Sequence, residues 1–436
     1  MGGGLLQLVA YGAQDAYLTG NPHITFWKIL YKRHTNFAVE AFRVNFTGAP
    51  TYGQRLVAVV NRNADLVWKT YVEVTLPETR ASKTGLAYDV KWTGADQQRL
   101  GYQLLKQVEV EIGGQVIDRH YGEWLYLWET LTADFDTATK LDAMVNNATQ
   151  DATTAIVDCA DRKKTLYIPL QFWFCRNPGL ALPLIALQYH EVRFNITLAD
   201  PTDLVSKGAW GSVSQAASKL PALNDMALYI DYVYLDVDER RRFAQESHEY
   251  LIDQLQYTGQ QQITTSSARL DLTLNHPVKE LIWVFQDERK MDCGSATTDT
   301  AGWTQPFDYN DIVDRCRLQI NGQDRFDERF GDYFWKVQPY QHHTAGGTAA
   351  WAASKYITAK NPINVYSFAI QPEEHQPSGT CNFSRIDNAT LVFDSDTTGA
   401  AGSYPSKSYP YNFRIYAVNY NVFRIMSGMG GLAYSN

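Results

Sequence analysis

Apolar and polar residues alternate with a period of two along most of the chain. In residues 68–75, one face carries Trp68, Thr70, Val72 and Val74, and the residues between them are mostly polar. The same alternation recurs in three further segments, 108–112, 192–198 and 270–274. Because successive side chains of a strand point to opposite faces of a sheet, each segment is predicted to be a half-buried strand.

Glycine-containing turn signals separate these segments. Examples are Gly113-Gly114, Asn177-Pro178-Gly179, Asn321-Gly322 and Pro377-Ser378-Gly379. Gly114 and Gly322 are predicted to adopt a positive φ, which a side chain would strain. Many short strands joined by close turns indicate an all-β sandwich or barrel. The alternation is absent from 122–146 and from the charged segment 238–248, and both are predicted to be helical.

Short matches recur in the same order in the two halves of the chain. Residues 37–40 match 250–253, 65–68 match 280–283, 112–115 match 320–323, and 121–124 match 330–333. The order predicts two tandem β-domains of similar topology, although all-β domains also share such patterns through composition alone. The division that we expect is an arm at 1–35, a first domain at 36–237, a connector at 238–248 and a second domain at 249–436. Trp68 and Trp283 occupy matching positions and are predicted to anchor the two cores.

Composition narrows the function classes. The 436 residues include 39 Lys and Arg against 47 Asp and Glu, which gives a net charge of −8, and 13% of them are aromatic. A chain this rich in large rings can bury extensive surface and is not a disordered tail. A protein that wraps nucleic acid needs a surplus of Lys and Arg to neutralise phosphates, so no direct nucleic-acid partner is expected.

No pattern of catalytic, cofactor-binding or metal-ligating residues is found. The chain has no GxxxxGK[ST], HExxH or GxSxG motif and no dinucleotide fingerprint. Its five cysteines form no close pair, which argues against a zinc site and against a disulfide framework. His342 and His343 are neighbours and are interpreted as a surface loop pair, and no HxH motif supports a metalloenzyme of the cupin kind. The longest apolar stretch, 180–187, is far shorter than the roughly 20 residues that span a bilayer.

Several long stretches resemble one protein family. They include LVAYGAQDAYLTGNPHITFWKILYKRHTNFAVE at 8–40, PGLALPLIALQYHEVRF at 178–194, QPSGTCNFSRIDNATLVF at 376–393 and YNVFRIMSGMGGLAYSN at 420–436. Together with 243–256 and 321–326, these stretches resemble the major capsid proteins of large icosahedral DNA viruses, in particular those of green-algal viruses such as chlorella viruses. The resemblance runs from end to end and fails mainly in the polar loops.

The resemblance implies a fold, an assembly and a location. The fold would be a double jelly-roll, with two tandem eight-stranded antiparallel sandwiches. Three chains would form a capsomer of nearly hexagonal outline that tiles an icosahedral shell around an inner membrane, above a layer of minor capsid proteins. The chain would be made in the host cytoplasm, reside in the virion, and have no enzymatic activity and no cofactor. Two alternatives stay open, a minor capsid paralogue of the same fold and a carbohydrate-binding β-sandwich protein.

Two further candidate sites follow from this reading. The segment between Asn21 and Thr35 has no acidic residue and mixes large apolar side chains with basic ones, among them Trp27, Lys28, Lys32 and Arg33. It is interpreted either as an assembly arm that grips a neighbouring chain, a minor capsid protein or the membrane, or as a plug of its own first domain. Family members carry glycans on outer loops, and of the five Asn-x-Ser/Thr sequons only the one at Asn147 falls in a predicted loop.

Overall fold

The protein is described by a computed structural model. The residues described are 10–77, 91–92, 99–145, 165–206, 213–288, 309–344, 362–395 and 410–434, with Gly4, Leu8, Thr84 and Phe307. They fall into two compact units, Met1–Phe37 and Ala38–Asn436. In the first unit the described chain is extended except for helix α2 (Ala16–Thr19), which buries none of its residues. The described residues of this unit therefore build no core of their own.

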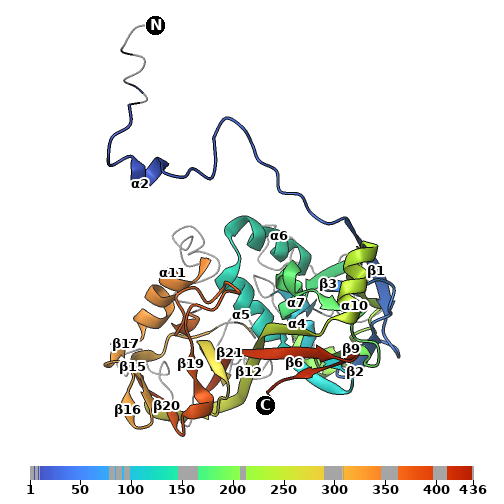
Figure 1. The fold of residues 1–436 in the computed structure, drawn as a ribbon. Coiled ribbons are helices and arrows are strands. Elements are labelled where there is room, and N and C mark those ends of the chain that lie inside the picture. The colour runs from blue at the N-terminus through green and yellow to red at the C-terminus, as the bar shows by residue number, and fades with distance from the viewer. Residues whose placement is uncertain are drawn as a thin grey trace. The chain divides into compact units, whose positions relative to one another are not determined.

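The first half of the second unit is a sandwich of two sheets (Figure 1). One sheet has the order β1 (Phe37–Asn45), β11 (Asp225–Leu235), β3 (Leu66–Thr75) and β7 (Thr165–Pro169), and β8 (Leu182–Pro183) also pairs with β3. The other has the order β2 (Arg55–Val59), β9 (Val192–Leu198), β5 (Leu105–Ile112) and β6 (Gln115–Tyr121). A short ribbon joins β10 (Val205–Ser206) to β4 (Lys91–Trp92). We call this sandwich domain 1.

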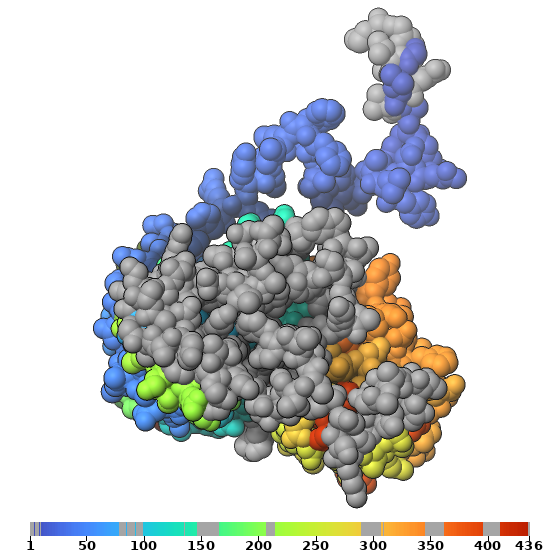
Figure 2. All heavy atoms as spheres, turned by 180° about the vertical axis from the view of Figure 1, so that it is seen from behind, coloured from blue at the N-terminus to red at the C-terminus, as the bar shows by residue number. Residues whose placement is uncertain are grey.

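The second half repeats this strand order, and we call it domain 2. One sheet has the order β12 (His248–Ile263), β21 (Tyr411–Met426), β14 (Pro277–Asp287) and β18 (Asn364–Ser367), with β19 (Cys381–Asn382) on β14 and β22 (Met429–Leu432) on β21. The other has the order β13 (Ser267–Asp271), β20 (Ala389–Ser395), β15 (Val313–Ile320) and β16 (Gln323–Asp324), with β17 (Arg329–Phe330) on β15. In domain 1 the first strand, β1, lies beside β11, and in domain 2 the first strand, β12, lies beside the equivalent β21. The predicted double jelly-roll is confirmed. The two halves lie side by side, blue to green and yellow to red, when seen from the front and from behind (Figures 1 and 2).

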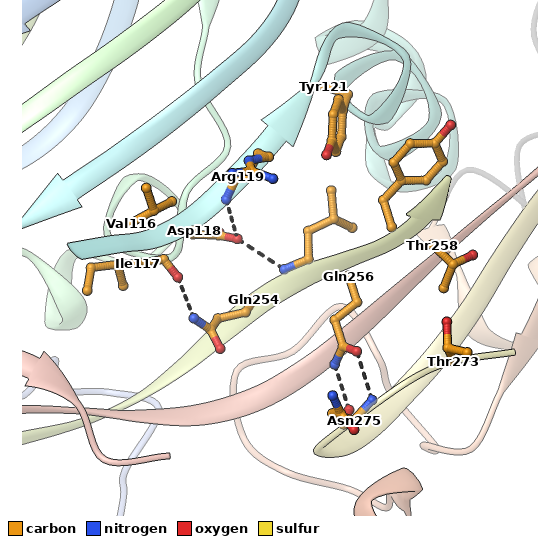
Figure 3. A pocket seen from close by; sticks show the side chains of 12 residues that line it. Val116, Ile117, Asp118, Arg119, Tyr121, Gln254, Gln256, Thr258, Thr273 and Asn275 are labelled. Atoms are coloured by element: carbon orange, nitrogen blue, oxygen red, sulfur yellow. Dashed lines mark hydrogen bonds between the residues drawn. The ribbon is translucent and has the colours of Figure 1, made fainter. Parts of the chain in front are cut away.

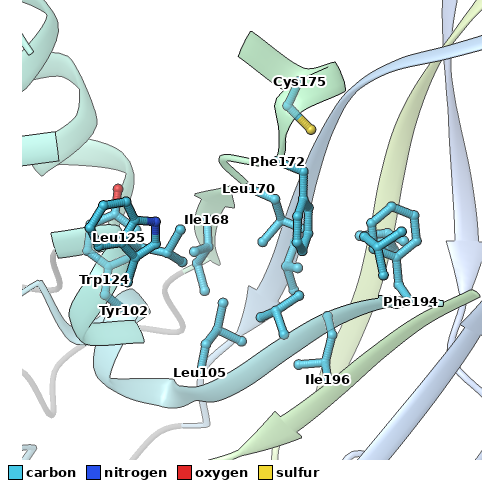
Figure 4. Packing of buried hydrophobic residues seen from close by; sticks show 14 of the residues in the cluster. Tyr102, Leu105, Trp124, Leu125, Ile168, Leu170, Phe172, Cys175, Phe194 and Ile196 are labelled. Atoms are coloured by element: carbon cyan, nitrogen blue, oxygen red, sulfur yellow. The ribbon is translucent and has the colours of Figure 1, made fainter. Parts of the chain in front are cut away.

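Helices occupy the connections between the strands. The predicted helix over 122–146 is two helices, α5 (Gly122–Thr132) and α6 (Phe135–Val145), and the charged segment after domain 1 contains α10 (Val237–Gln245). The remaining described helices are α4 (Leu100–Leu104), α7 (Trp173–Arg176), η1 (Pro178–Leu180), α8 (Pro201–Leu204), α9 (Val213–Ala217), η3 (Tyr333–Val337), α11 (Gln338–His342) and η4 (Phe383–Arg385). In domain 1, side chains of α4 and α5 meet those of the strands in one apolar cluster (Figure 4).

Two pairs of glycines support the repeat. Gly114 and Gly322, at φ 87° and 78°, lie in the two-residue turns of the β5–β6 and β15–β16 hairpins, as predicted. Gly122 directly follows β6, and Gly331 directly follows β17. A Cβ on Gly122 would lie 1.9 Å from the Tyr102 carbonyl oxygen, and one on Gly331 would lie 2.0 Å from that of Val313. Only glycine fits at this corner in either domain.

Strand pairing corrects the alignment of β3 with β14. Val67 pairs with Leu182 of β8, and Val278 pairs with Cys381 of β19, so Val67 and Val278 are equivalent. Each is followed by a bulge that adds one residue to its strand. Counting on from the bulges, the counterpart of Trp283 is Val72, four residues beyond the position that the sequence match gave. The match of 65–68 with 280–283 is therefore wrong in register.

The bulge in β3 also explains why Trp68 and Trp283 differ in burial. Trp283 is 1% exposed and packs in the domain 2 core against the Phe334 ring, at 5.3 Å between centroids. Trp68 lies within the β3 bulge, where the alternation changes phase. It is only partly buried, beside a small cluster outside the main core, and the Lys69 ammonium lies 4.6 Å from its ring. The expectation of two equivalent core anchors is thus corrected at Trp68.

Replacing Trp283 by Ala is expected to lower the free energy of unfolding by about 3–5 kcal/mol, because it empties a large volume in a closed core. The matched control, Trp68→Ala, removes the same side chain from a partly exposed position and should cost clearly less. Urea unfolding of both variants measures the two losses. Equal losses would contradict the register that we assign to β3 and β14.

Candidate functional site

The two domains of the second unit contact each other across a sheet that is buried on both of its faces. Alternate residues of β14 and β21, including Trp283, Phe285 and Ile415, face the core of domain 2. The residues between them belong to the apolar cluster of domain 1; they are Ile282, Val284, Tyr416 and Val418. All four are at most 2% exposed. The sheet that contains β14 and β21 therefore packs against the cores of both jelly-rolls, and we call it the shared wall.

A polar network crosses this wall from Glu123, the second residue of α5. The Arg414 guanidinium on β21 donates from Nη2 to the Glu123 carboxylate at 2.7 Å, and its Nε lies 2.7 Å from the other oxygen of that carboxylate in an ion pair. The Tyr416 hydroxyl donates to the same carboxylate at 2.5 Å, and the Tyr309 hydroxyl does so at 3.1 Å. Burial raises the pKa of Tyr416 well above its usual value, and the nearby carboxylate raises it further. The hydroxyl therefore stays protonated and keeps donating.

A second buried charge cluster lies on the same wall. Lys279, which is fully buried in the β14 bulge, donates to Asp253 of β12 at 3.0 Å, and Arg176 at the end of α7 reaches the same carboxylate oxygen at 3.4 Å. Burial lowers the pKa of Lys279, while the Asp253 carboxylate acts in the opposite direction. Arg176 comes from domain 1 and the other two residues from domain 2, so this cluster also fixes the domains against each other.

The edges of β6 and β12 meet across a pocket of about 390 Å³ (Figure 3). The Leu255 N–H donates to Asp118 at 3.1 Å, the Gln254 amide donates to the Ile117 carbonyl, and the Gln256 side chain pairs with the Asn275 backbone. These polar groups are thus largely engaged with one another. The arrangement is that of a seam between domains rather than of a prepared catalytic pocket.

The C-terminal hairpin adds a further link between the domains. Its turn follows β21, and the Tyr189 N–H of domain 1 donates to the Gly428 carbonyl at 3.0 Å. A Cβ on Gly428 would lie 2.7 Å from the Tyr189 ring, so the close approach requires glycine there. The C-terminal hairpin is in this way held against domain 1.

His343 was not recognised as a structural residue from the sequence. It is buried, with Nε2 at 3.1 Å from Glu280 of β14 and Nδ1 at 3.0 Å from Glu373. Burial alone lowers the pKa of His343, but the two carboxylates outweigh it and raise that pKa to about 9. The interpretation of His342 and His343 as a surface pair is therefore wrong for His343. Its partners lie 63 and 30 residues away in the sequence, and no local pattern indicates them.

The other predicted site residues lie apart from this contact. Trp27, Lys28, Lys32 and Arg33 are exposed within the first unit, Trp27 at 95%. Asn147 lies outside the described residues. Among the residues that the structure describes, no group of three His, Cys, Asp or Glu side chains could hold a metal ion. Within the same residues, no helix combines the length and apolar character needed to cross a bilayer.

Comparisons with known proteins give one consistent result. Residues 25–236 match the family "Major capsid protein N-terminus", and residues 239–431 match "Large eukaryotic DNA virus major capsid protein". The major capsid protein of Pyramimonas orientalis virus is 48% identical, and that of Paramecium bursaria Chlorella virus 1 is 40% identical, each over the full length of both chains. A solved chain from the quasi-atomic model of the capsid of the latter virus superposes with a TM-score of 0.75 at 35% identity, covering 94% of this chain and 100% of that one.

Replacing Arg414 by Met is expected to cost about 3–5 kcal/mol of unfolding free energy, because it leaves the Glu123 carboxylate partly buried without its cation. The matched control is Arg424→Met on the same strand. Arg424 pairs with Glu249 where both side chains are about half exposed, so its loss should cost at most about 1 kcal/mol. Chemical denaturation compares the two variants. Similar costs for both would show that the buried network does not hold the domains.

The buried His343 should make stability depend on pH. Its folded pKa of about 9 lies above the usual 6.5, so its contribution is fully present below pH 6.5 and is lost as the pH rises through 9. The shift corresponds to about 3 kcal/mol. Thermal unfolding between pH 6 and pH 10 should show this loss in the parent chain and in His342→Gln, but not in His343→Gln. An unchanged pH profile in His343→Gln would contradict the assignment.

Proposed function

Because this chain belongs to the family of large eukaryotic DNA virus major capsid proteins, we propose that it forms a homotrimeric, pseudo-hexagonal capsomer that tiles an icosahedral shell around an inner membrane. Its relatives are capsid proteins of virions, and the role of the chain is structural. The observation that carries the proposal is the presence of two jelly-rolls of the same strand order in one chain.

Duplication within the chain gives threefold symmetry a nearly sixfold outline. Three copies present six similar domains, and a near-hexagon covers a surface without gaps. The shared wall supports this reading, because a domain pair that could flex would not keep the hexagonal spacing. Extensive apolar burial between the domains is also typical of permanent contacts. The net charge of −8 favours a shell outside a membrane over a layer bound to nucleic acid.

The first unit supports a role in assembly. It carries large apolar side chains, Trp27 among them, together with the basic Lys28, Lys32 and Arg33, and all of its described residues are exposed. We propose that this arm lies beneath the capsomer and contacts a neighbouring capsomer, a minor capsid protein or the inner membrane.

The proposal also includes a division of the chain and a place for it. The arm is 1–35, domain 1 is 36–237, the connector is 238–248, and domain 2 is 249–436, in line with family matches that end at 236 and begin again at 239. We further propose synthesis in the host cytoplasm, incorporation into the virion shell, and Asn147 as the glycosylation candidate. Intact-mass analysis and peptide mapping of protein from virions test the last point.

Light scattering tests the trimer directly. The full chain should have a mass near three times 49.4 kDa, whereas a lectin-like β-sandwich would be a monomer. A chain that lacks residues 1–30 should remain a folded trimer but fail to assemble into shells. A monomeric full chain would overturn the proposal. Loss of the trimer only on truncation would instead identify the arm as a plug of its own domain.

A further inference from the structure

The two domains have equivalent sheets, but equivalent residues on the outer faces of these sheets differ in burial. Beyond the bulges, Thr70 and Leu281 lie opposite Ile230 and Ala417, so Tyr71 is the counterpart of Ile282, and Tyr229 that of Tyr416. The domain 2 residues of these pairs are at most 1% exposed, because domain 1 covers them. The domain 1 residues are only partly buried.

These partly buried residues belong to an aromatic row, which we call the tyrosine face. It consists of Tyr71, Tyr167 and Tyr229 on the outer side of three neighbouring strands, β3, β7 and β11. The Tyr71 and Tyr229 rings are parallel, 5.2 Å apart, and the Tyr167 ring meets Tyr71 edge-on at 6.1 Å. Because Tyr71 and Tyr229 stack on each other, they do not present flat open rings on which a sugar could lie. Tyr-rich surfaces are typical of protein interfaces.

What covers the equivalent face of domain 2 indicates what would cover the tyrosine face. The end of β6 and the start of α5 lie on it: the Tyr121 ring contacts Tyr257, Glu123 accepts from the Tyr416 hydroxyl, and the Trp124 ring lies 5.7 Å from that of Tyr416. This edge of domain 1 thus supplies two rings and one carboxylate.

Domain 2 carries the same edge, and it is uncovered. Tyr121 pairs with Gln107, which lies seven residues before the turn residue Gly114. Phe330 pairs with Arg315, which lies seven residues before the equivalent Gly322, so Phe330 corresponds to Tyr121. The glycine corner then places Asp332 at the position of Glu123 and Tyr333 at that of Trp124. Phe330 is 61% exposed, and Tyr340 of α11, on the same helical connection, is 69% exposed. Asp332 is exposed and binds Lys336 at 2.6 Å.

We propose that the tyrosine face of one copy binds the helical edge of domain 2 of a second copy, in the way that domain 2 binds domain 1 within the chain. The helical edge is defined by Phe330, Asp332, Tyr333 and Tyr340. The inference rests on the proposed trimer and adds the surfaces that build it. The Tyr229 hydroxyl donates to the Asp332 carboxylate across this contact, as Tyr416 donates to Glu123.

Such a contact joins two different surfaces, so each copy offers one and receives the other. Contacts of this kind close into a ring when the rotation between copies allows it. Ala227 occupies the position of Arg414, so the contact between copies contains no equivalent of the buried guanidinium. Glu73 occupies the position of Val284, so this contact also carries a carboxylate where the contact within the chain has an apolar side chain.

Cross-linking with a short bismaleimide tests the pairing of surfaces. A chain with both Tyr229→Cys and Asp332→Cys should give a covalent species of three chains, at least tenfold above the parent chain and above either single variant. The matched control combines Tyr229→Cys with Met429→Cys. Met429 is 53% exposed, belongs to the C-terminal hairpin and lies on neither surface. It should give no such species.

A charge substitution provides a second measurement. Tyr340→Arg should shift the trimer to a monomer with an unchanged circular dichroism spectrum, while Val237→Arg, at a similarly exposed position on α10, should remain a trimer. A parent trimer that neither cross-links through 229 and 332 nor responds to Tyr340→Arg would overturn this inference and leave the proposed function standing. A monomeric parent chain would overturn both.

Discussion

The structure depends on the burial of one sheet on both of its faces. Residues of β14 and β21 point alternately into the core of domain 2 and into the apolar cluster of domain 1, so neither half can withdraw without exposing a continuous apolar surface. Exposed apolar area costs roughly 25 cal/mol per Å², and this cost holds the two sandwiches together. The apolar contact alone is not directional. The Glu123–Arg414 and Asp253–Lys279 pairs supply the direction, because a shifted docking would leave buried charges without partners.

Much of this fold follows from patterns that extend over few residues. Period-two alternation located strands, Gly114 and Gly322 located equivalent hairpins, and the order of the short matches predicted two similar domains. What failed depends on contacts between distant residues. A bulge at Trp68 shifts the phase of β3, and a bulge can be located only once its partner strand is known. The same holds for His343, since Glu280 and Glu373 approach it only after the sheets and helices have packed. The Glu123–Arg414 pair spans 291 residues and has no local signal at all.

The two domains share a strand order but differ in what covers their sheets. Ile282 and Val284 are closed in by the neighbouring domain, whereas their counterparts in domain 1 are the partly exposed Tyr71 and Glu73. This difference supports the proposed trimer, in which one of two equivalent contacts is made within the chain and the other is made between copies. A tyrosine is suited to the second kind of surface, since it tolerates water before assembly and still buries a large ring afterwards. The described residues of the first unit also expose apolar side chains, which suits the role in assembly that we propose for it.

An electron cryo-microscopy reconstruction of the purified oligomer would test the central claim most directly. Two rotations can be measured in it: the one that carries domain 1 onto domain 2 within a chain, and the one that carries domain 2 onto domain 1 of the next chain. Both should be about one sixth of a turn, with β14 and β21 buried on both faces in every copy. Unequal rotations, or domains that separate along β21, would contradict the view that this chain is a rigid duplicated unit.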